Sequence, residues 1–279
     1  MIKYKEDKNI LKKIINKKKY CWLITGVAGF IGSNILEELL KLDQKVIGID
    51  NLSTGYLKNL KEVQNIVGKK KWKNFNFING DISNINTCKK TIKNVDIVLH
   101  QAARGSIPKS TKDPIATNND NVTGFINILT ASKENNIKSF VYASSSSVYG
   151  DSKKLPKTEK KTGKVLSNYA LTKKVNEEYS RIFFQLYNYK TIGLRYFNVF
   201  GKRQNPNGDY AAVIPRWINN VINGEKIIIY GDGKTSRDFC PISNVVQANI
   251  LAGIKQLKTR NYVFNVGTGS RVSLKKLSM

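Results

Sequence analysis

Short apolar segments alternate with amphipathic segments of helical periodicity along most of this chain, and this alternation restricts the possible folds more than any other feature. The apolar segments have the length of strands and lie at 21–26, 45–50, 75–82, 95–103, 139–146 and 191–201. The helical segments include 30–42, a long one around 114–136 and another near 168–188. Strands that are joined by helical crossovers run parallel in one sheet. The sequence therefore predicts an α/β fold with a doubly wound parallel sheet.

The composition changes after residue 201, where the turn-rich sequence "GKRQNPNGDY" begins. Beyond it we predict a helix over 211–224, a short strand over 226–231, a loop over 232–240 and a helix near 242–257. We divide the chain into a basic N-terminal helix or arm at 1–20, a larger α/β domain at 21–201 and a smaller lobe at 202–279. Within the arm, apolar residues at helical spacing predict a short helix that packs against the domain: Ile10, Leu11, Ile14 and Ile15.

The charge of the chain is strongly positive, with 47 Lys and Arg against 20 Asp and Glu and a formal net charge of +27. Such a charge is compatible with binding to nucleic acid or to an anionic membrane. The lysines are scattered along the whole chain, however, and groups such as "NKKKY" and "GKKKWK" are short. We therefore predict a solvated basic surface and no nucleic-acid partner.

Cysteine and histidine are too sparse to indicate a metal site. The cysteines, Cys21, Cys88 and Cys240, lie far apart, and His100 is the only histidine. Their spacing matches no set of metal ligands, and it favours a reducing, cytoplasmic environment. The basic N-terminus lacks the apolar core of a signal peptide, and no apolar run approaches the roughly 18 residues of a membrane span. We predict no metal and no membrane insertion.

The glycine-rich sequence "TGVAGFIG" (25–32) joins the first predicted strand to the first predicted helix. Gly26, Gly29 and Gly32 leave the backbone bare where the diphosphate of a dinucleotide can approach the N-terminus of a helix. A tight strand–helix turn would also explain these glycines. Asp50 favours the dinucleotide, because it ends the second strand and can hydrogen-bond both hydroxyls of the adenosine ribose. Its carboxylate would repel a 2′-phosphate, so the motif predicts NAD rather than NADP.

A second motif lies in "SNYALTKKVNEEYS" (167–180), where Tyr169 and Lys173 share one face of a predicted helix. Such a pair arises by chance in many helices, and alone it indicates only solvated surface. Ser145 stands upstream, at the end of the fifth predicted strand in "YASSSSVYG". A serine at a strand end and a Tyr–Lys helix, downstream of a dinucleotide motif, together indicate catalysis.

The chain resembles the extended short-chain dehydrogenase/reductase family over nearly its whole length, in its glycine spacing, in "GDI" at 80–82, in "HQAA" at 100–103 and in the Ser–Tyr–Lys set. The resemblance implies that 21–201 is an NAD-binding Rossmann domain, that 202–279 is a substrate lobe and that His100 is a packed strand residue. The cofactor residues that it implies are Gly26, Gly29, Phe30, Ile31, Gly32, Asp50, Asn51, Gly55, Asp81, Ile82, Gln101, Ala102, Ala103, Tyr169, Lys173 and Val199.

The same resemblance implies roles for the catalytic residues. Tyr169 would take the proton of a sugar hydroxyl while hydride leaves the same carbon for the nicotinamide. Lys173 would hold the nicotinamide ribose and, together with the positive nicotinamide ring, lower the pKa of Tyr169. Ser145, with Ser146 as the next candidate, would hydrogen-bond the reacting oxygen.

Residues after the fifth strand separate the branches of this family. Sugar dehydratases carry Thr-Asp-Glu at the positions of Ser145, Ser146 and Ser147, and decarboxylating relatives carry Glu at the third of them. Without a carboxyl group at Ser146 or Ser147, elimination lacks its acid and base. Oxidation followed by re-reduction at C4 of the sugar remains.

Four further segments resemble the UDP-N-acetylglucosamine 4-epimerases that serve bacterial surface polysaccharides: "QAARGSIPKSTKDP", "GLRYFNVFGKRQNPNG", "YAAVIPRW" and "GDGKTSRDFC". This resemblance implies a UDP-N-acetylhexosamine or its uronate as substrate, a resident NAD and a 4-keto intermediate. Asn198 and Arg237 would hold the diphosphate, and Arg104 would either reach solvent or favour a uronate carboxylate. The substrate residues that it implies are Gly105, Ser106, Ser145, Ser146, Tyr169, Asn198, Ala212, Val213, Tyr230 and Arg237.

Three alternatives stay open at this point: a dehydratase or decarboxylase of the same family, a truncated and inactive NAD- or nucleotide-sugar-binding protein, and a basic nucleic-acid binder. The sequence ends at "GTGSRVSLKKLSM", where family members continue for several tens of residues, so we expect the lobe at 202–279 to be incomplete. Ser145, Tyr169 and Lys173 argue against an inactive protein. Family members often dimerise through two helices, here near 114–136 and 168–188, and we expect a homodimer.

Overall fold

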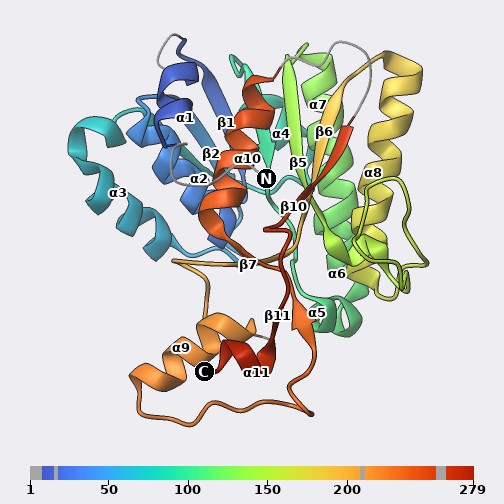
Figure 1. Cartoon of the computed structure of the whole chain (residues 1–279). Helices are drawn as coiled ribbons and strands as arrows, with labels where there is room; N and C mark the ends of the chain where they lie inside the picture. The colour runs from blue at the N-terminus through green and yellow to red at the C-terminus, as the bar shows by residue number, and fades with distance from the viewer. Residues whose placement is uncertain (1–7, 16–17, 208–210, 256–261) are drawn as a thin grey trace.

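The computed structural model describes residues 8–15, 18–207, 211–255 and 262–279, and within these residues a seven-stranded sheet forms the centre of the molecule (Figure 1). Its strands are β1 (Cys21–Thr25), β2 (Lys45–Asp50), β3 (Phe75–Asn79), β4 (Ile97–His100), β5 (Ser139–Ser145), β6 (Thr191–Tyr196) and β10 (Tyr262–Val266). The order is β10-β6-β5-β4-β1-β2-β3, and all neighbours pair in parallel. The predicted doubly wound sheet is confirmed, and its strand order reverses between β1 and β4, where such folds form a ligand crevice.

Helices cover both faces of this sheet (Figure 1). One layer contains α1 (Lys8–Ile15), α2 (Phe30–Lys41), α3 (Leu57–Trp72) and α10 (Ile242–Ile254). The other contains α4 (Ile85–Thr91), α7 (Gly124–Glu134) and α8 (Asn168–Tyr187). In β1, Trp22 and Ile24 enter the first layer, whereas Leu23 enters the second. Burial on both sides is the reason that the central strands are continuous apolar runs in the sequence.

The N-terminal helix that the sequence predicted is present as α1. Leu11 and Ile15 are buried in the same core as α2 and α10, whereas Ile14 is 48% exposed. Residues 1–7 and 16–17 of the predicted arm lie outside the described residues. Leu11 and Ile15 therefore attach this helix to the first layer.

Residues after β6 form a smaller lobe and also complete the sheet. The lobe contains β7 (Asn198–Phe200), α9 (Val213–Ile222), β8 (Ser236–Arg237), β9 (Phe239–Pro241), β11 (Val272–Ser273) and α11 (Leu274–Leu277). β7 pairs with β9 and β8 with β11, and Figure 1 shows α9 and α11 together, apart from the main helical layers. Because β10 joins β6 and α10 packs on the sheet, the central fold extends past residue 201, where the sequence analysis placed the domain boundary.

Some predicted elements differ from the observed ones. The helix predicted over 114–136 is divided into α6 (Pro114–Asn118), a π-helical turn (Asn119–Thr123) and α7. The strand predicted over 191–201 is broken at Phe197, because β7 leaves the main sheet to pair with β9. The prediction of a strand over 226–231 was wrong, because this segment has no regular secondary structure. Side chains of α9 bind the carbonyl groups of the segment instead, since Trp217 Nε1 donates to Ile228 O and Asn220 Nδ2 to Lys226 O.

Candidate active site

A cleft of about 360 Å³ lies at the carboxyl ends of the parallel strands. It brings the glycine turn after β1 together with the end of β2, the end of β5 and the first turn of α8. All predicted cofactor residues except Gly55 line it: Gly26, Gly29, Phe30, Ile31, Gly32, Asp50, Asn51, Asp81, Ile82, Gln101, Ala102, Ala103, Tyr169, Lys173 and Val199. The predicted catalytic residue Ser145 lines it as well. Motifs far apart in the sequence therefore share one cavity.

The glycine turn presents bare backbone to this cleft. Gly26 has φ +69°, and a Cβ atom there would lie 2.8 Å from the backbone nitrogen of Ala102. A Cβ atom on Gly32 would lie 2.2 Å from the carbonyl oxygen of Gly26. Among the described residues no side chain caps the start of α2 at Gly29, so its first-turn N–H groups and its positive dipole end are available to an anion. This arrangement fits the diphosphate of a dinucleotide such as NAD.

Asp50 is fixed at the cleft end of β2. Its Oδ2 accepts the N–H of Ala28 at 2.9 Å and its Oδ1 accepts the N–H of Leu52 at 2.8 Å. Burial raises the pKa of Asp50, and the two backbone hydrogen bonds oppose that rise. Gly55 lies behind this carboxylate, because a Cβ atom there would stand 2.8 Å from both oxygens. Gly55 therefore makes room for Asp50 instead of lining the cleft itself.

Tyr169 and Lys173 lie together in the first turns of α8. Lys173 Nζ stands 5.9 Å from the centroid of the Tyr169 ring and donates to the carbonyl of Ala143 at 2.9 Å. Burial lowers the pKa of Lys173 to about 8. Burial also raises the pKa of Tyr169, against a hydrogen bond from Ser145. The sequence analysis expected Lys173 to lower the pKa of Tyr169; in the protein alone desolvation outweighs any such effect.

Ser145 is held at the end of β5 by the short 3₁₀ turn Ser146–Tyr149. The N–H of Ser147 donates to Ser145 Oγ at 3.1 Å, and the hydroxyl of Ser147 donates to the same atom at 2.9 Å. Ser146 does not line the cleft. Of the two candidate serines, the geometry therefore favours Ser145.

A buried ion pair between Glu177 and Arg195 contacts the end of β5 through Ser144. Ser144 Oγ donates to Glu177 Oε1 at 2.6 Å, and Glu177 receives two 2.8 Å hydrogen bonds from Arg195 on β6. Arg195 also donates to the hydroxyl of Tyr149 at 3.1 Å, and that hydroxyl donates to Asn265 Oδ1 at 2.6 Å. The network joins β5, α8, β6 and β10, and it includes Ser144, the neighbour of Ser145 in the chain.

Several predicted substrate residues lie outside the cleft. Gly105 and Tyr169 line it, together with Ser145. Ser106 caps the helix α5 (Ile107–Lys112), and Asn198 Nδ2 donates to the carbonyl of Asp238 at 3.1 Å. Five further predicted substrate residues do not line the cleft either: Ser146, Ala212, Val213, Tyr230 and Arg237. Ser146 directly follows β5, and the other four belong to the lobe. Arg104 is paired with Asp120, at 2.5 Å between Nε and Oδ2.

The cleft also contains residues that the sequence analysis missed: Ile49, Ser53, Thr54, Gly80, Asp120, Ala143, Ser144, Tyr196 and Phe197. Several stand at the carboxyl ends of β2, β5 and β6 or just beyond them. The rule that ligands bind at these strand ends could have identified them. Asp120 had no such signal, because it faces the cleft from a π-helical turn inside a predicted continuous helix.

His100 is a structural residue of β4, as the sequence analysis expected. Its side chain is 1% exposed, and its Nδ1 lies 2.8 Å from Thr25 Oγ1. Burial lowers the pKa of His100 to about 3, so the ring is neutral at physiological pH. The described residues contain no cluster of His, Cys, Asp and Glu that could hold a metal ion, and no described helix is long and apolar enough to span a bilayer.

The sequence and the fold of this chain are both similar to those of known nucleotide-sugar epimerases. Residues 22–267 match the model of the NAD dependent epimerase/dehydratase family. A putative UDP-glucose 4-epimerase of Methanocaldococcus jannaschii is 37% identical over 257 residues, which cover 91% of this chain and 79% of that protein. The structure of a UDP-N-acetylglucosamine 4-epimerase from Methanobrevibacter ruminantium M1, in complex with UDP-N-acetylmuramic acid, matches with a TM-score of 0.86 and 38% identity over 94% of this chain and 80% of that chain. The structure of a UDP-glucuronic acid 4-epimerase from Bacillus cereus, in complex with UDP-glucuronic acid and NAD, matches with a TM-score of 0.81 and 29% identity over 92% and 80% of the two chains.

Proposed function

The chain belongs to the NAD-dependent epimerase/dehydratase family, and we propose that it is an NAD-dependent 4-epimerase of a UDP-N-acetylhexosamine or its uronic acid. The observation that carries the proposal is the shared cleft, in which Ser145, Tyr169 and Lys173 face the same cavity as the glycine turn and Asp50. A protein that only bound the nucleotide would not need Ser145, Tyr169 and Lys173. We further propose that the enzyme acts in the cytoplasm and supplies surface polysaccharide synthesis.

The residues of this chain would divide the work between binding and proton transfer. NAD, when bound, supplies reversible hydride transfer and, in its oxidised form, a positive charge. Tyr169 takes the proton of the C4 hydroxyl and later returns a proton to the C4 oxygen. Ser145, fixed by Ser147, hydrogen-bonds the reacting oxygen. Lys173, held by the carbonyl of Ala143, is placed to bind a ribose hydroxyl.

The identity of the sugar is inferred from the solved relatives and from the contacts of Arg104. The solved relatives include enzymes for UDP-N-acetylglucosamine and for UDP-glucuronic acid. A uronate carboxylate would have to compete with Asp120 for Arg104, since these two side chains already form an ion pair. This pairing favours the N-acetylhexosamine over its uronic acid.

Product analysis tests the activity. We expect purified protein to convert UDP-N-acetylglucosamine into its C4 epimer. Tyr169 would serve as the acid–base residue for oxidation and re-reduction at C4, and the positions of Ser146 and Ser147 carry no carboxyl group for elimination. The nucleotide sugars should be separated by chromatography and identified by NMR, with the C6-oxidised substrate in parallel. A product that had lost water or carbon dioxide, or no product from either substrate, would contradict the proposal.

We also propose a homodimer that forms through α6, α7 and α8. Leu171, Tyr179 and Leu186 lie along α8 at a spacing that places them on one face, and they are 49%, 37% and 67% exposed. Ile115 on α6 is 84% exposed. Exposed apolar side chains that share one helix face support a protein–protein contact there.

The change Leu186→Lys should shift the protein from dimer to monomer in light scattering after size-exclusion chromatography, because it places a charge within the proposed apolar contact. Ile222→Lys on α9 is the matched control, since Ile222 is 77% exposed on a different helix. Equal behaviour of the two variants would contradict this interface.

A further inference from the structure

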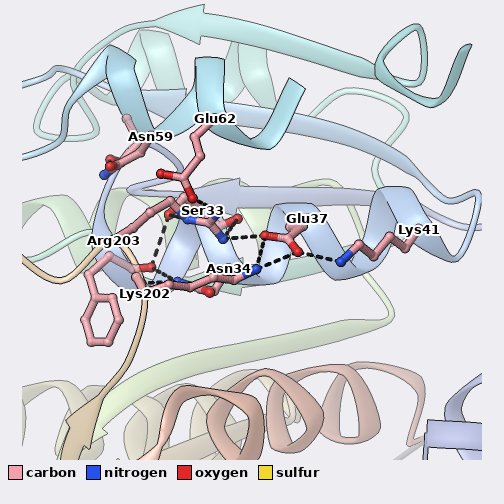
Figure 2. A network of polar contacts seen from close by, with 10 residues as sticks. Ser33, Asn34, Glu37, Lys41, Asn59, Glu62, Lys202 and Arg203 are labelled. Carbon is pink, nitrogen blue, oxygen red and sulfur yellow. Dashed lines mark hydrogen bonds and ion pairs between the residues drawn. The ribbon is translucent and has the colours of Figure 1, made fainter. Parts of the chain in front are cut away.

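A polar network outside the cleft, buried at its centre, joins α2 to the segment that follows β7 (Figure 2). Its centre is the carboxylate of Glu37, which is 3% exposed. Lys41 and Lys202 approach this carboxylate to 2.5 Å, and Arg203 Nη2 approaches it to 2.7 Å. Burial alone would raise the pKa of Glu37, but the hydrogen bonds from these three cations lower it to about 2. Glu37 is therefore ionised at any physiological pH.

Arg203 joins this carboxylate to a second helix. Its side chain is 1% exposed, and its Nη1 lies 3.0 Å from Glu62 on α3. Its Nε donates to Ser33 Oγ on α2 at 3.1 Å. The backbone of Arg203 has φ +64°, a left-handed conformation that costs a non-glycine residue about 1–2 kcal/mol. Such a conformation persists where surrounding contacts fix it, as the three contacts of this guanidinium do.

The same segment is attached to the turn of α2 that borders the cleft. Asn34 Nδ2 donates to the carbonyl of Phe30 at 2.8 Å and to the carbonyl of Lys202 at 3.0 Å, and Figure 2 shows Asn34 and Lys202 side by side. Phe30 lines the cleft, and so does Val199, which precedes the segment on β7. The first turn of α2 and the strand β7, which both border the dinucleotide site, are thus connected by the contacts of Lys202 and Arg203. Beyond them the chain continues to α9 in the lobe.

We propose that Arg203 is a positioning residue that couples the dinucleotide site to the nucleotide-sugar site. A diphosphate bound at the N-terminus of α2 fixes the first turn of that helix, and Asn34 and Arg203 pass this constraint to the segment at 201–205. That segment leads into the lobe, so occupancy of one site favours the geometry that the other requires. Coupling of this kind is reciprocal. It presupposes the proposed function, because both ligands must bind to this chain.

The variant Arg203→Met removes the guanidinium but leaves Lys41 and Lys202 to neutralise Glu37, so we expect it to fold. Arg203→Gly removes the same group and also relieves the strained backbone. Arg181→Met is the matched control, because Arg181 pairs with Glu178 on the exposed side of α8. Urea denaturation of all three variants measures their stability separately from ligand binding.

Affinity for UDP, measured by isothermal titration calorimetry with NAD-saturated and with NAD-free protein, tests the coupling. We expect NAD to tighten UDP binding about tenfold in the wild-type protein and in the Arg181→Met variant. In both Arg203 variants the ratio should fall below about twofold, whereas a purely stabilising residue would leave the ratio unchanged. A wild-type ratio near one, or an undiminished ratio in either Arg203 variant, would overturn the coupling. Wild-type protein that bound neither NAD nor UDP would instead refute the proposed function, and the coupling with it.

Discussion

Replacement of Tyr169 by phenylalanine should lower kcat for C4 epimerisation by about 10²- to 10⁴-fold, the range that a positioned acid–base group contributes. The change removes one hydroxyl from the cleft and leaves the ring, which packs beside Lys173. Binding of NAD should change little, because the glycine turn, Asp50 and Lys173 are untouched. Initial rates at saturating substrate and calorimetric titration with NAD measure the two quantities separately.

Tyr187→Phe is the matched control for this prediction. Tyr187 lies on the same helix and is 51% exposed, outside the residues that line the cleft. The control should retain wild-type kcat. Full activity of the Tyr169→Phe variant would show that proton transfer depends on another group, and it would remove the central residue from the proposed mechanism.

Replacement of Arg195 by methionine should lower the free energy of unfolding by about 3–5 kcal/mol, because it leaves the Glu177 carboxylate buried without its cation. Glu177 and Arg195 have side-chain exposures of 6% and 4%, and their contact at 2.8 Å joins α8 to β6. The change would also remove the hydrogen bond that Arg195 donates to the hydroxyl of Tyr149. Urea denaturation followed by circular dichroism gives the free energy of unfolding.

Two comparisons separate the buried charge from simple loss of contact. Arg181→Met, which breaks the exposed pair with Glu178, should cost less than about 1 kcal/mol. The double variant Glu177→Leu/Arg195→Met should recover most of the stability, because neither charge is then left buried alone. If the double variant were as unstable as Arg195→Met, packing rather than charge would explain the loss.

The sequence predicted well which residues gather around the glycine turn, because local patterns determine their positions. The glycine turn, Asp50 at a strand end and the Tyr169–Lys173 spacing each belong to one strand–helix unit, and the order of such units places them at one edge of the sheet. Gly55 was the exception, since its neighbour Asp50 and not the cleft requires a glycine there.

The positions of the proposed substrate residues could not be predicted in the same way. The positions of Asn198 and Arg237 depend on pairing between short strands far apart in the chain, β7 with β9 and β8 with β11. Tyr230 lies in a segment whose apolar run resembled a strand, yet side chains of α9 bind its carbonyls. The pKa of Tyr169 also escaped prediction, because desolvation depends on the packing around the ring and not on the spacing to Lys173.

The position of β10 has a consequence for how the chain acquires its structure. β6 pairs with β5 on one side and with β10 on the other, but the lobe lies between β6 and β10 in the sequence. During synthesis, β6 therefore emerges with an open edge that stays unpaired until Tyr262–Val266 has left the ribosome. Unpaired edges of apolar strands readily recruit other chains. We therefore expect the nascent protein to be exposed to aggregation through this edge while its lobe is being made.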